Sequence, residues 1–558
     1  MLNNQTKIRS ASFYILGALL LLTLSFNGGY YNSEQLLLAI PISIIGVLML
    51  RLSTGHSLQI SKLTVIGALI IGWAVIEWRT SPTLYISRGI IPLLLMYSVV
   101  GLTSQQLLHK HRTYMLIVII TIIGINALLS CGEEVLHKSI ILTFHGIEAA
   151  CVPTRYNGLL LNPNFSGGFS CAGLIMTLCW LGMTKRYKII GGISSVVFIE
   201  SILASQSRAA LLISFFYLII LSIFLFSQKL RSGAIACLIA ICIELVLCMS
   251  HQQLINRVAE IKKTKLDANI ATGEGLRLAY WRGSFDLWKK EPIIGIHPMM
   301  LNSRWPEVQP KNHQSYPFHS HNFMLQILCE YGIIGGLLVC SFLLVCATGF
   351  LKCLREKKII EIVAYSGALV LLTHDLLDYS LFEPLHGFTL LILLGLGSST
   401  SFPETRFRNS TILLLSSTLV TMLAIQVQQA YTEHYAKINT IKSVNEALDW
   451  DPNNAALHLQ LSRLFVDPQH MATEAFTALK LDPYNITAET ELAVCLASTQ
   501  RAISDNLIKG MLQKDPNSSI AYKQATFYYH TVGNHVAESN TLVILNSFPA
   551  TSEGFQTH

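Results

Sequence analysis

Long apolar runs fill the first three quarters of the chain, and they restrict its fold more than any other feature. Each run has at least 14 residues, and a helix needs about 20 apolar residues to cross a bilayer, so shorter runs take in flanking residues. The first run follows Lys7 and Arg9 as in a signal peptide, but no small-x-small cleavage site follows it, so we expect it to remain a helix. We therefore expect an all-α polytopic membrane protein with about 13 transmembrane helices, at residues 11–26, 35–50, 63–78, 89–102, 114–130, 165–183, 189–204, 209–226, 233–249, 323–350, 359–377, 385–399 and 411–428.

The composition agrees with a membrane location. Hydrophobic residues make up 51% of the chain and charged residues only 13%, against roughly 25% charged residues in an average soluble domain. Such a chain is not an ordinary soluble enzyme. The net charge of +7 comes from 40 Lys and Arg against 33 Asp and Glu, and these basic residues stand in small groups between apolar runs. This distribution is typical of membrane orientation and argues against nucleic acid as a partner.

Basic residues occur in every second connection between the apolar runs, beginning with the N-terminal segment. Connections that carry Lys and Arg stay in the cytoplasm, whereas long loops are exempt from this rule. We therefore expect a cytoplasmic N-terminus, and we expect the segment 131–164, the long loop at about 250–322 and the C-terminus outside the cytoplasm. The basic connections lie at residues 51–62, 110–112, 185–188, 229–231, 352–358 and 406–408.

A repeat begins where the composition turns polar, near residue 430. Three segments, 447–454, 478–485 and 511–518, each carry an Asp-Pro turn, and their prolines are 31 and 33 residues apart. A helix, a turn and a second amphipathic helix at this period resemble tetratricopeptide repeats. We therefore expect a transmembrane domain at 1–429 and a soluble α-helical repeat domain at 430–558. The repeats either bind a peptide on a concave surface or cap the membrane domain.

The cysteines predict one disulfide and no metal site. Nine of the twelve lie in or beside apolar runs, where a thiol is a small hydrophobe, and Cys495 is alone in the repeat region. Cys131 and Cys151 share one outside segment, where an oxidising compartment permits a disulfide. Neither Cys-x-x-Cys nor His-Glu-x-x-His spacing occurs, so we expect no metal ligands and no cofactor.

A polar motif stands where the long loop re-enters the membrane. His319, His321 and Asn322 precede an apolar run, and nine residues separate Asn322 from Gly332. One interpretation is structural, with Asn322 capping a helix and with Gly332 and the next glycines permitting close helix packing. The other interpretation is that this polar end forms an active site.

The second interpretation is favoured because the motif resembles a known family. His-Asn, nine residues, Gly, two residues and Gly is the pattern of the O-antigen ligase superfamily, which also contains O-antigen polymerases and bacterial protein O-oligosaccharyltransferases. The resemblance covers roughly residues 60–400. Further landmarks of the family stand in order: Asn-Pro-Asn at 162–164, Ser-Gln-Ser-Arg-Ala-Ala at 205–210, Arg277 with Trp281, Pro-Ile-Ile-Gly at 292–295, and His-Asp-Leu-Leu-Asp-Tyr at 374–379.

The resemblance implies an inner-membrane glycosyltransferase that acts on the periplasmic side without a metal. Such enzymes move a glycan from an undecaprenyl diphosphate carrier to an acceptor hydroxyl. The leaving diphosphate is anionic, and arginine suits it because its guanidinium is planar, bidentate and always charged. Arg208 and Arg277 are therefore the expected diphosphate ligands. Arg282 is an alternative to Arg277, and Arg155 is a weaker candidate for a phosphate or sugar.

A hydroxyl acceptor benefits from a positioned base with a pKa near ambient pH, and histidine meets that need. His321 is the expected base, although binding of diphosphate as an imidazolium is the rival role, and His319 is not distinguished from it. His374, with Asp378 four residues on, either faces the site or makes a hydrogen bond between helices. His297 is expected to be a solvated loop residue.

The acceptor is the open part of this expectation. A repeat domain outside the membrane can hold a polypeptide, so protein Ser or Thr is the favoured acceptor. The alternatives are lipid A-core, as in lipopolysaccharide ligation, and a growing glycan, as in O-antigen polymerisation. A transporter of the lipid-linked glycan is a distant alternative of another class.

Overall fold

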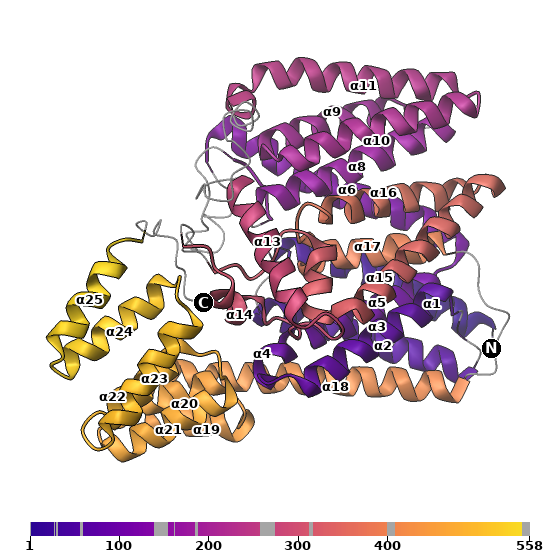
Figure 1. Cartoon of the computed structure of the whole chain (residues 1–558). Helices are drawn as coiled ribbons and strands as arrows, with labels where there is room; N and C mark the ends of the chain where they lie inside the picture. The colour runs from indigo at the N-terminus through magenta and orange to yellow at the C-terminus, as the bar shows by residue number, and fades with distance from the viewer. Residues whose placement is uncertain are drawn as a thin grey trace. The chain divides into compact units, whose positions relative to one another are not determined.

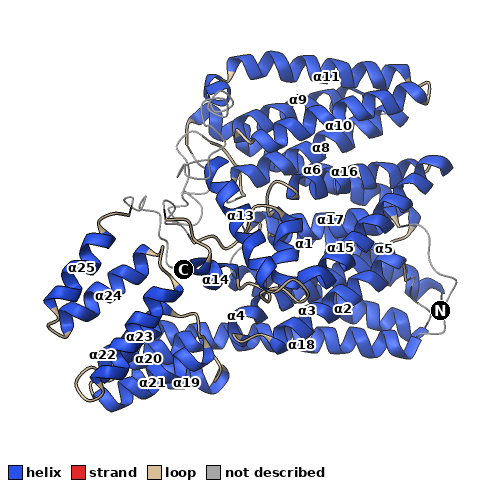
Figure 2. Ribbon diagram, in the orientation of Figure 1, coloured by secondary structure: helices blue, strands red, loops and turns tan. Residues whose placement is uncertain are grey.

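The computed structural model describes residues 2–548 except 27, 30–31, 56–57, 59, 139–154, 161, 185–187, 257–273, 312–315 and 399–407. Every regular element in this described part is helical (Figure 2). Eleven helices are long and apolar enough to cross a membrane. The fold class expected from the sequence, an all-α polytopic membrane protein, is therefore confirmed.

The thirteen apolar runs all fall on helices. Eleven runs coincide with membrane-length segments, and the other two coincide with the shorter helices α16 (Ile359–Asp375) and α17 (Pro384–Gly397). The short run at 89–102 does extend back to Leu84, because α4 (Leu84–Ser87), a 3-10 turn and α5 (Ile91–Gln105) form one crossing. The remaining membrane-length helices are α1 (Leu2–Ser25), α2 (Asn32–Gly55), α3 (Lys62–Thr80), α6 (His109–Leu136), α8 (Pro163–Thr184), α9 (Lys188–Ser205), α10 (Arg208–Ser227), α11 (Arg231–Ser250), α15 (Phe323–Glu356) and α18 (Arg408–Ile438).

The segment expected outside the membrane from residue 131 begins later than the sequence suggested. Helix α6 continues to Leu136, so Cys131 lies on this helix, and its thiol donates to the carbonyl of Val197 at 3.7 Å. Cys151 lies outside the described residues. The disulfide between the two cysteines therefore stays a prediction.

The chain forms two compact units, and helix α8 is the centre of the first. This unit comprises residues 1–71, 93–263 and 338–423. Within it α8 packs against α6, α9, α10, α11 and α16 (Figure 1), and most of its residues are buried. Glycines on α8 permit these close approaches: a Cβ on Gly173 would lie 2.8 Å from Ile123 and 2.9 Å from Phe198.

The second unit comprises residues 72–92, 264–337 and 424–558. Its loop portion folds around Trp305, which is fully buried in a cluster with Tyr280, Leu287, Ile296, Met300, Leu301 and Cys329. Helix α13 (Glu274–Lys290) approaches this indole at Gly283, where a Cβ would lie 2.5 Å from the ring. The short helix α14 (Leu301–Arg304) leads directly into Trp305. The long loop is therefore an ordered subdomain over its described residues.

Seven short helices follow α18 in the second unit, and they repeat a helical hairpin. Each Asp-Pro turn leads to a residue whose side chain caps the next helix, namely Asn454, Asn485 and Ser518. The sequence predicted this alternation of helices and turns, whereas membership in the tetratricopeptide class stays a prediction. The helices are α19 (Ile441–Trp450), α20 (Ala455–Leu464), α21 (Pro468–Leu481), α22 (Ile486–Leu496), α23 (Arg501–Lys514), α24 (Ser519–Thr531) and α25 (His535–Leu545).

Candidate functional site

Asn322 caps helix α15. Its side-chain Oδ1 accepts the backbone N–H of Leu325 at 2.9 Å, and the hydroxyl of Ser320 donates to the Asn322 carbonyl at 2.8 Å. Asparagine is among the best residues for satisfying the orphan donors of a first helical turn. The structural interpretation of Asn322 therefore holds. The substrate-binding role of Asn322 and the catalytic role of its neighbour His321 stay predictions.

Gly332 interrupts α15 because another loop passes directly over it. Its φ of 62° and ψ of −164° lie in a region that only glycine occupies without strain, and a Cβ there would lie 2.1 Å from the carbonyl oxygen of Ile293. Gly295 mirrors it, with φ of 81° and a Cβ position 2.5 Å from the backbone of Glu330. The alternative interpretation of Gly332 as a site of close helix packing does not hold, because Gly332 contacts loop backbone.

Backbone hydrogen bonds close this junction between the two motifs. The N–H of Ile333 donates to the carbonyl of Pro292 at 2.9 Å, and the N–H of Ile296 donates to the carbonyl of Cys329 at 2.9 Å. The indole of Trp73 donates to the carbonyl of Tyr331 at 3.1 Å, next to the interruption. The Pro-Ile-Ile-Gly segment is therefore hydrogen-bonded directly to the helix that follows His321 and Asn322.

The ring of His321 is oriented by helix α13. It stacks on the ring of Tyr280 with centroids 5.9 Å apart and planes 10° apart, and Tyr280 in turn meets Trp305 edge to face at 5.4 Å. The backbone of His321 has φ of 53°, which is uncommon for a residue with a side chain. Such conformations persist where the surroundings enforce them, and they cluster at functional sites.

The same helix separates the two arginine candidates of the long loop. Arg277 lies three residues before Tyr280, so both occupy one face of α13, and Arg277 is half-buried. Arg282 lies two residues after Tyr280, on another face, and it is exposed. The structure therefore brings Arg277, and not Arg282, to the side of α13 that faces His321. His319 is half-buried beside the buried Ser320.

In the first unit, Arg208 begins helix α10. The hydroxyl of Ser207 caps this helix by accepting the N–H of Ala210 at 3.3 Å, and Gln206 before it has φ of 51°. A Cβ on Gly167 would lie 2.6 Å from the Ser205 hydroxyl, so the start of α8 touches this turn. The half-buried Arg208 thus stands where the first turns of α8 and α10 meet, and helix N-termini favour anions.

Arg155 connects the landmarks of the first unit. Its Nε donates to the carbonyl of Ser205 at 2.9 Å, and its Nη2 donates to the side-chain oxygen of Asn164 at 2.5 Å. Asn162 caps α8 locally, since its Oδ1 accepts the N–H of Asn164 at 2.9 Å. The Asn-Pro-Asn segment and the turn before Arg208 are therefore held together by Arg155.

His374 does not pair with Asp378 along a helix, as the four-residue spacing suggested, because α16 ends at Asp375. The Asp375 carboxylate accepts the backbone N–H of Ser380 at 2.9 Å and that of Leu381 at 2.8 Å, so it orders the turn that contains Asp378. The ring of His374 is buried against Gly168, and among the described residues neither ring nitrogen has a hydrogen-bond partner. The expected hydrogen bond between helices is absent there.

The structure contains two buried acid–histidine pairs that the sequence motifs did not predict. Glu383 pairs with Nδ1 of His386, whose Nε2 lies 3.1 Å from the carbonyl of Phe165. Glu77 lies 2.8 Å from Nδ1 of His297, and both residues are buried, so the expectation that His297 is solvated is wrong. The sequence did contain a signal for these pairs, because Glu77, Glu383 and His386 are ionisable residues within or beside apolar runs.

In the second unit, the Asp-Pro turns of the repeats contact the segments at 72–92 and 264–337. Asp451 receives two hydrogen bonds from the buried guanidinium of Arg88, at 3.1 and 2.8 Å. Tyr85 donates to Asp482 at 3.2 Å, and the hydroxyls of Tyr316 and Ser518 lie 2.6 Å apart. All three turns of the repeat are thus used for packing against other parts of this unit.

A second contact of the same kind surrounds Arg304. Its guanidinium pairs with Glu291 at 2.7 Å and with Glu307, and it lies over the ring of Tyr484 at 4.8 Å. Hydrogen bonds from Arg304 and Lys290 hold the pKa of Glu307 below its usual value despite the opposing effect of burial. Arg304 therefore connects the end of α14 to the second Asp-Pro turn.

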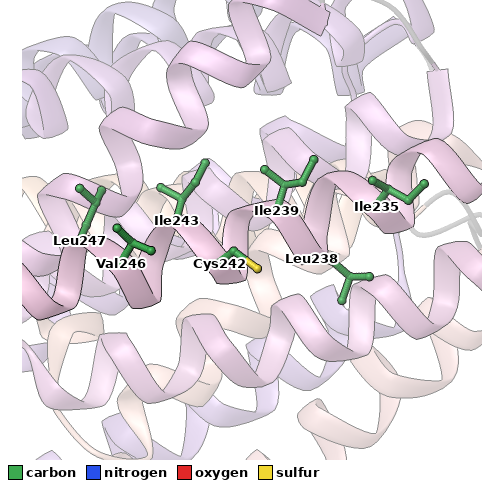
Figure 3. Close-up of a pocket in the computed structure, with 7 residues that line it drawn as sticks. All are labelled: Ile235, Leu238, Ile239, Cys242, Ile243, Val246 and Leu247. Carbon is green, nitrogen blue, oxygen red and sulfur yellow. The ribbon is translucent and has the colours of Figure 1, made fainter.

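The hollow on helix α11 is not a candidate site. Ile235, Leu238, Ile239, Cys242, Ile243, Val246 and Leu247 line it, and all of them are apolar and come from one helix (Figure 3). Their spacing places them on one exposed stripe, which is the surface that a membrane helix presents to lipid.

Comparison with protein families matches the middle of the chain, which contains some of the motifs. No curated protein matches the chain. Residues 170–340 match the family model described as O-antigen ligase. The matched region contains Arg208, Arg277, His321 and Gly332, whereas Arg155 and His374 lie outside it. The match confirms the resemblance predicted from the motifs: residues 170–340, less than a third of the chain, are similar to the O-antigen ligase family.

Proposed function

We propose that this protein is a membrane glycosyltransferase of the ligase type. It moves a glycan from an undecaprenyl diphosphate carrier to an acceptor hydroxyl on the periplasmic side of the bacterial inner membrane. The observation that carries the proposal is that the O-antigen ligase-like region contains a preorganised histidine, His321, which is stacked on Tyr280 one helical turn from Arg277.

In the proposed reaction the acceptor oxygen attacks the anomeric carbon of the donor sugar. The bond between that carbon and the diphosphate oxygen breaks, and the electron pair leaves with undecaprenyl diphosphate. Arg277, in the same compact unit as His321, is the proposed ligand of the leaving group, because the charge and fork geometry of arginine match diphosphate oxygens. Arg208 as a second ligand stays a prediction from the family motif. These arginines supply the charge stabilisation, so no metal ion is assigned to the reacting atoms.

His321 takes the proton of the acceptor hydroxyl as the oxygen attacks. Its ring plane is set by Tyr280, and its backbone is set by the Asn322 cap and the Gly332 junction. A base held in this way typically contributes about 10² to 10⁴ in rate. Binding of diphosphate by the imidazolium is the rival role, and a separate measurement of donor binding distinguishes it from the base role.

Protein Ser or Thr is the favoured acceptor. The repeat helices belong to the same compact unit as His321, and their Asp-Pro turns contact Arg88 and Tyr316, of which Tyr316 lies in the loop that carries His321. This arrangement supports a repeat domain that presents a polypeptide near the site. The family description favours the second candidate, a ligase that transfers O-antigen to lipid A-core.

Deletion of the gene in its host separates these acceptors. The lipopolysaccharide ladder and the periplasmic glycoproteins are compared in the deletion strain, in a strain complemented with the wild type and in one complemented with His321→Ala. Loss of glycoprotein staining alone supports the protein acceptor. Loss of the ladder identifies a ligase or polymerase. If His321→Ala restores whichever product the deletion strain has lost, the proposed site is contradicted.

A further inference from the structure

Three potential metal ligands meet where helices α6, α9 and α11 end. Glu134 lies in the last turn of α6, Glu200 lies near the end of α9, and His251 directly follows α11. The Nε2 of His251 is 3.2 Å from the Glu134 carboxylate and 3.3 Å from the Glu200 carboxylate. Among the described residues this is the one group of three ligands whose donor atoms all lie within 4.8 Å of one another.

The imidazole of His251 is held in the orientation that a metal requires. Its Nδ1 lies 2.9 Å from the carbonyl of Leu247 and donates to it, so Nε2 is the nitrogen that faces both carboxylates. Metal-binding histidines characteristically donate their other ring N–H to a carbonyl or carboxylate, which fixes the tautomer and the ring plane. The cluster therefore includes the supporting hydrogen bond as well as the ligands.

The distances suit a small divalent ion. Tetrahedral ligands at about 2.0–2.1 Å from Zn²⁺ lie about 3.3 Å from one another, close to the 3.2 and 3.3 Å separations in this cluster. The side chains are partly accessible, with exposed fractions of 14% for His251, 26% for Glu134 and 31% for Glu200. An ion can therefore enter, and solvent can supply a fourth ligand.

We propose that Glu134, Glu200 and His251 bind a divalent transition-metal ion such as Zn²⁺. The charge of the ion neutralises both carboxylates. The sequence showed no metal-ligand spacing because the three ligands come from three helices.

The ion has a structural role in the first unit. Glu200 lies five residues before Ser205, where α9 ends and the turn to Arg208 begins. The side chain of Gln206 in this turn donates to Gln253, two residues after His251, at 2.9 Å. An ion at the three ligands therefore fixes the helix ends from which the Arg208 turn starts. It lies on residues that the proposed transfer reaction does not use.

Measuring the metal content of the protein tests this proposal independently of transfer activity. The purified full-length protein is stripped with a chelator, reloaded with Zn²⁺, freed of unbound ion and assayed by elemental analysis. We expect one Zn²⁺ per wild-type chain and at least about 100-fold weaker binding in His251→Gln and in Glu200→Gln. His470→Gln is the matched control, because His470 is an exposed histidine paired with one carboxylate, Asp467.

Thermal unfolding gives a second readout, in which each variant is compared with itself in the presence and absence of Zn²⁺. We expect Zn²⁺ to raise the unfolding temperature of the wild type and of His470→Gln but not that of His251→Gln. Mg²⁺ at the same concentration should have no such effect, because nitrogen ligands favour transition metals. Wild-type protein that retains no Zn²⁺ after loading overturns the proposal, as does equal retention by the wild type and His251→Gln.

Discussion

Replacing Gly332 with alanine tests the junction that supports His321. The new Cβ would lie 2.1 Å from the carbonyl oxygen of Ile293, so the backbone of one segment must move. A side chain at φ of 62° and ψ of −164° costs about 1–3 kcal/mol, and the displaced hydrogen bond from Ile333 to Pro292 costs about another 1 kcal/mol. We expect Gly332→Ala to destabilise the second unit by about 3 kcal/mol.

The assay is thermal unfolding of the purified protein in detergent. A unit of this size loses about 2–4 °C in unfolding temperature per kcal/mol, so a decrease of about 6–12 °C is expected. Gly72→Ala is the control, since a Cβ on Gly72 in α3 has no neighbour within 4 Å. If Gly332→Ala unfolds at the same temperature as Gly72→Ala, the junction is not the constraint that we describe.

Three further predictions concern topology and the repeat region. A periplasm-active reporter fused after Asn439, beyond the end of α18, should give signal because an odd number of crossings precedes it, whereas fusion after Lys358 should give none because an even number precedes it; activity only in the cytoplasm after Asn439 would show a miscounted span. Asp451→Asn should lower the free energy of unfolding by about 3–5 kcal/mol, since it leaves the buried guanidinium of Arg88 without its carboxylate; unchanged denaturant unfolding would contradict this. Burial raises the pKa of Asp515 to about 6 from 3.8, so its charged form opposes folding increasingly as pH rises from about 4 to above 6. Asp515→Asn should therefore stabilise the protein more at pH 8 than at pH 4, by up to about 2 kcal/mol, and equal unfolding temperature shifts at both pH values would refute the assignment.

The sequence was most informative about local structure. Apolar runs predict membrane helices because the bilayer requires about 20 apolar residues per crossing, and each run does fall on a helix. The cap at Asn322 and the helices after each Asp-Pro turn were also predictable, because caps and turns depend on neighbouring residues.

Contacts between distant segments were not predictable in the same way. The role of Gly332 depends on the loop at Ile293, and no local pattern indicates which backbone will pass over a glycine. The spacing of His374 and Asp378 suggested one helix, but the Asp375 carboxylate ends that helix by accepting hydrogen bonds from the following turn. Tertiary contacts determine the roles of Gly332 and His374, and a single sequence carries little information about such contacts.

In the candidate site, too, the sequence predicted residue types but not the contacts between distant segments. The motifs predicted which histidine and arginines to examine, and the family match covers Arg208, Arg277 and His321. The stacking of His321 on Tyr280, and the exposed position of Arg282, required the fold of the loop around Trp305. Residue types were therefore readable from the sequence, whereas their orientation was not.

The most direct test of the account is glycan transfer by the purified protein with lipid-linked donor and acceptor. We predict that His321→Ala loses at least 100-fold in transfer rate while it remains folded, and that the control His470→Ala keeps the wild-type rate. Normal donor binding by His321→Ala supports the base role, and lost donor binding assigns His321 to the diphosphate. Transfer by His321→Ala at the wild-type rate would contradict the central claim that His321 serves the reaction.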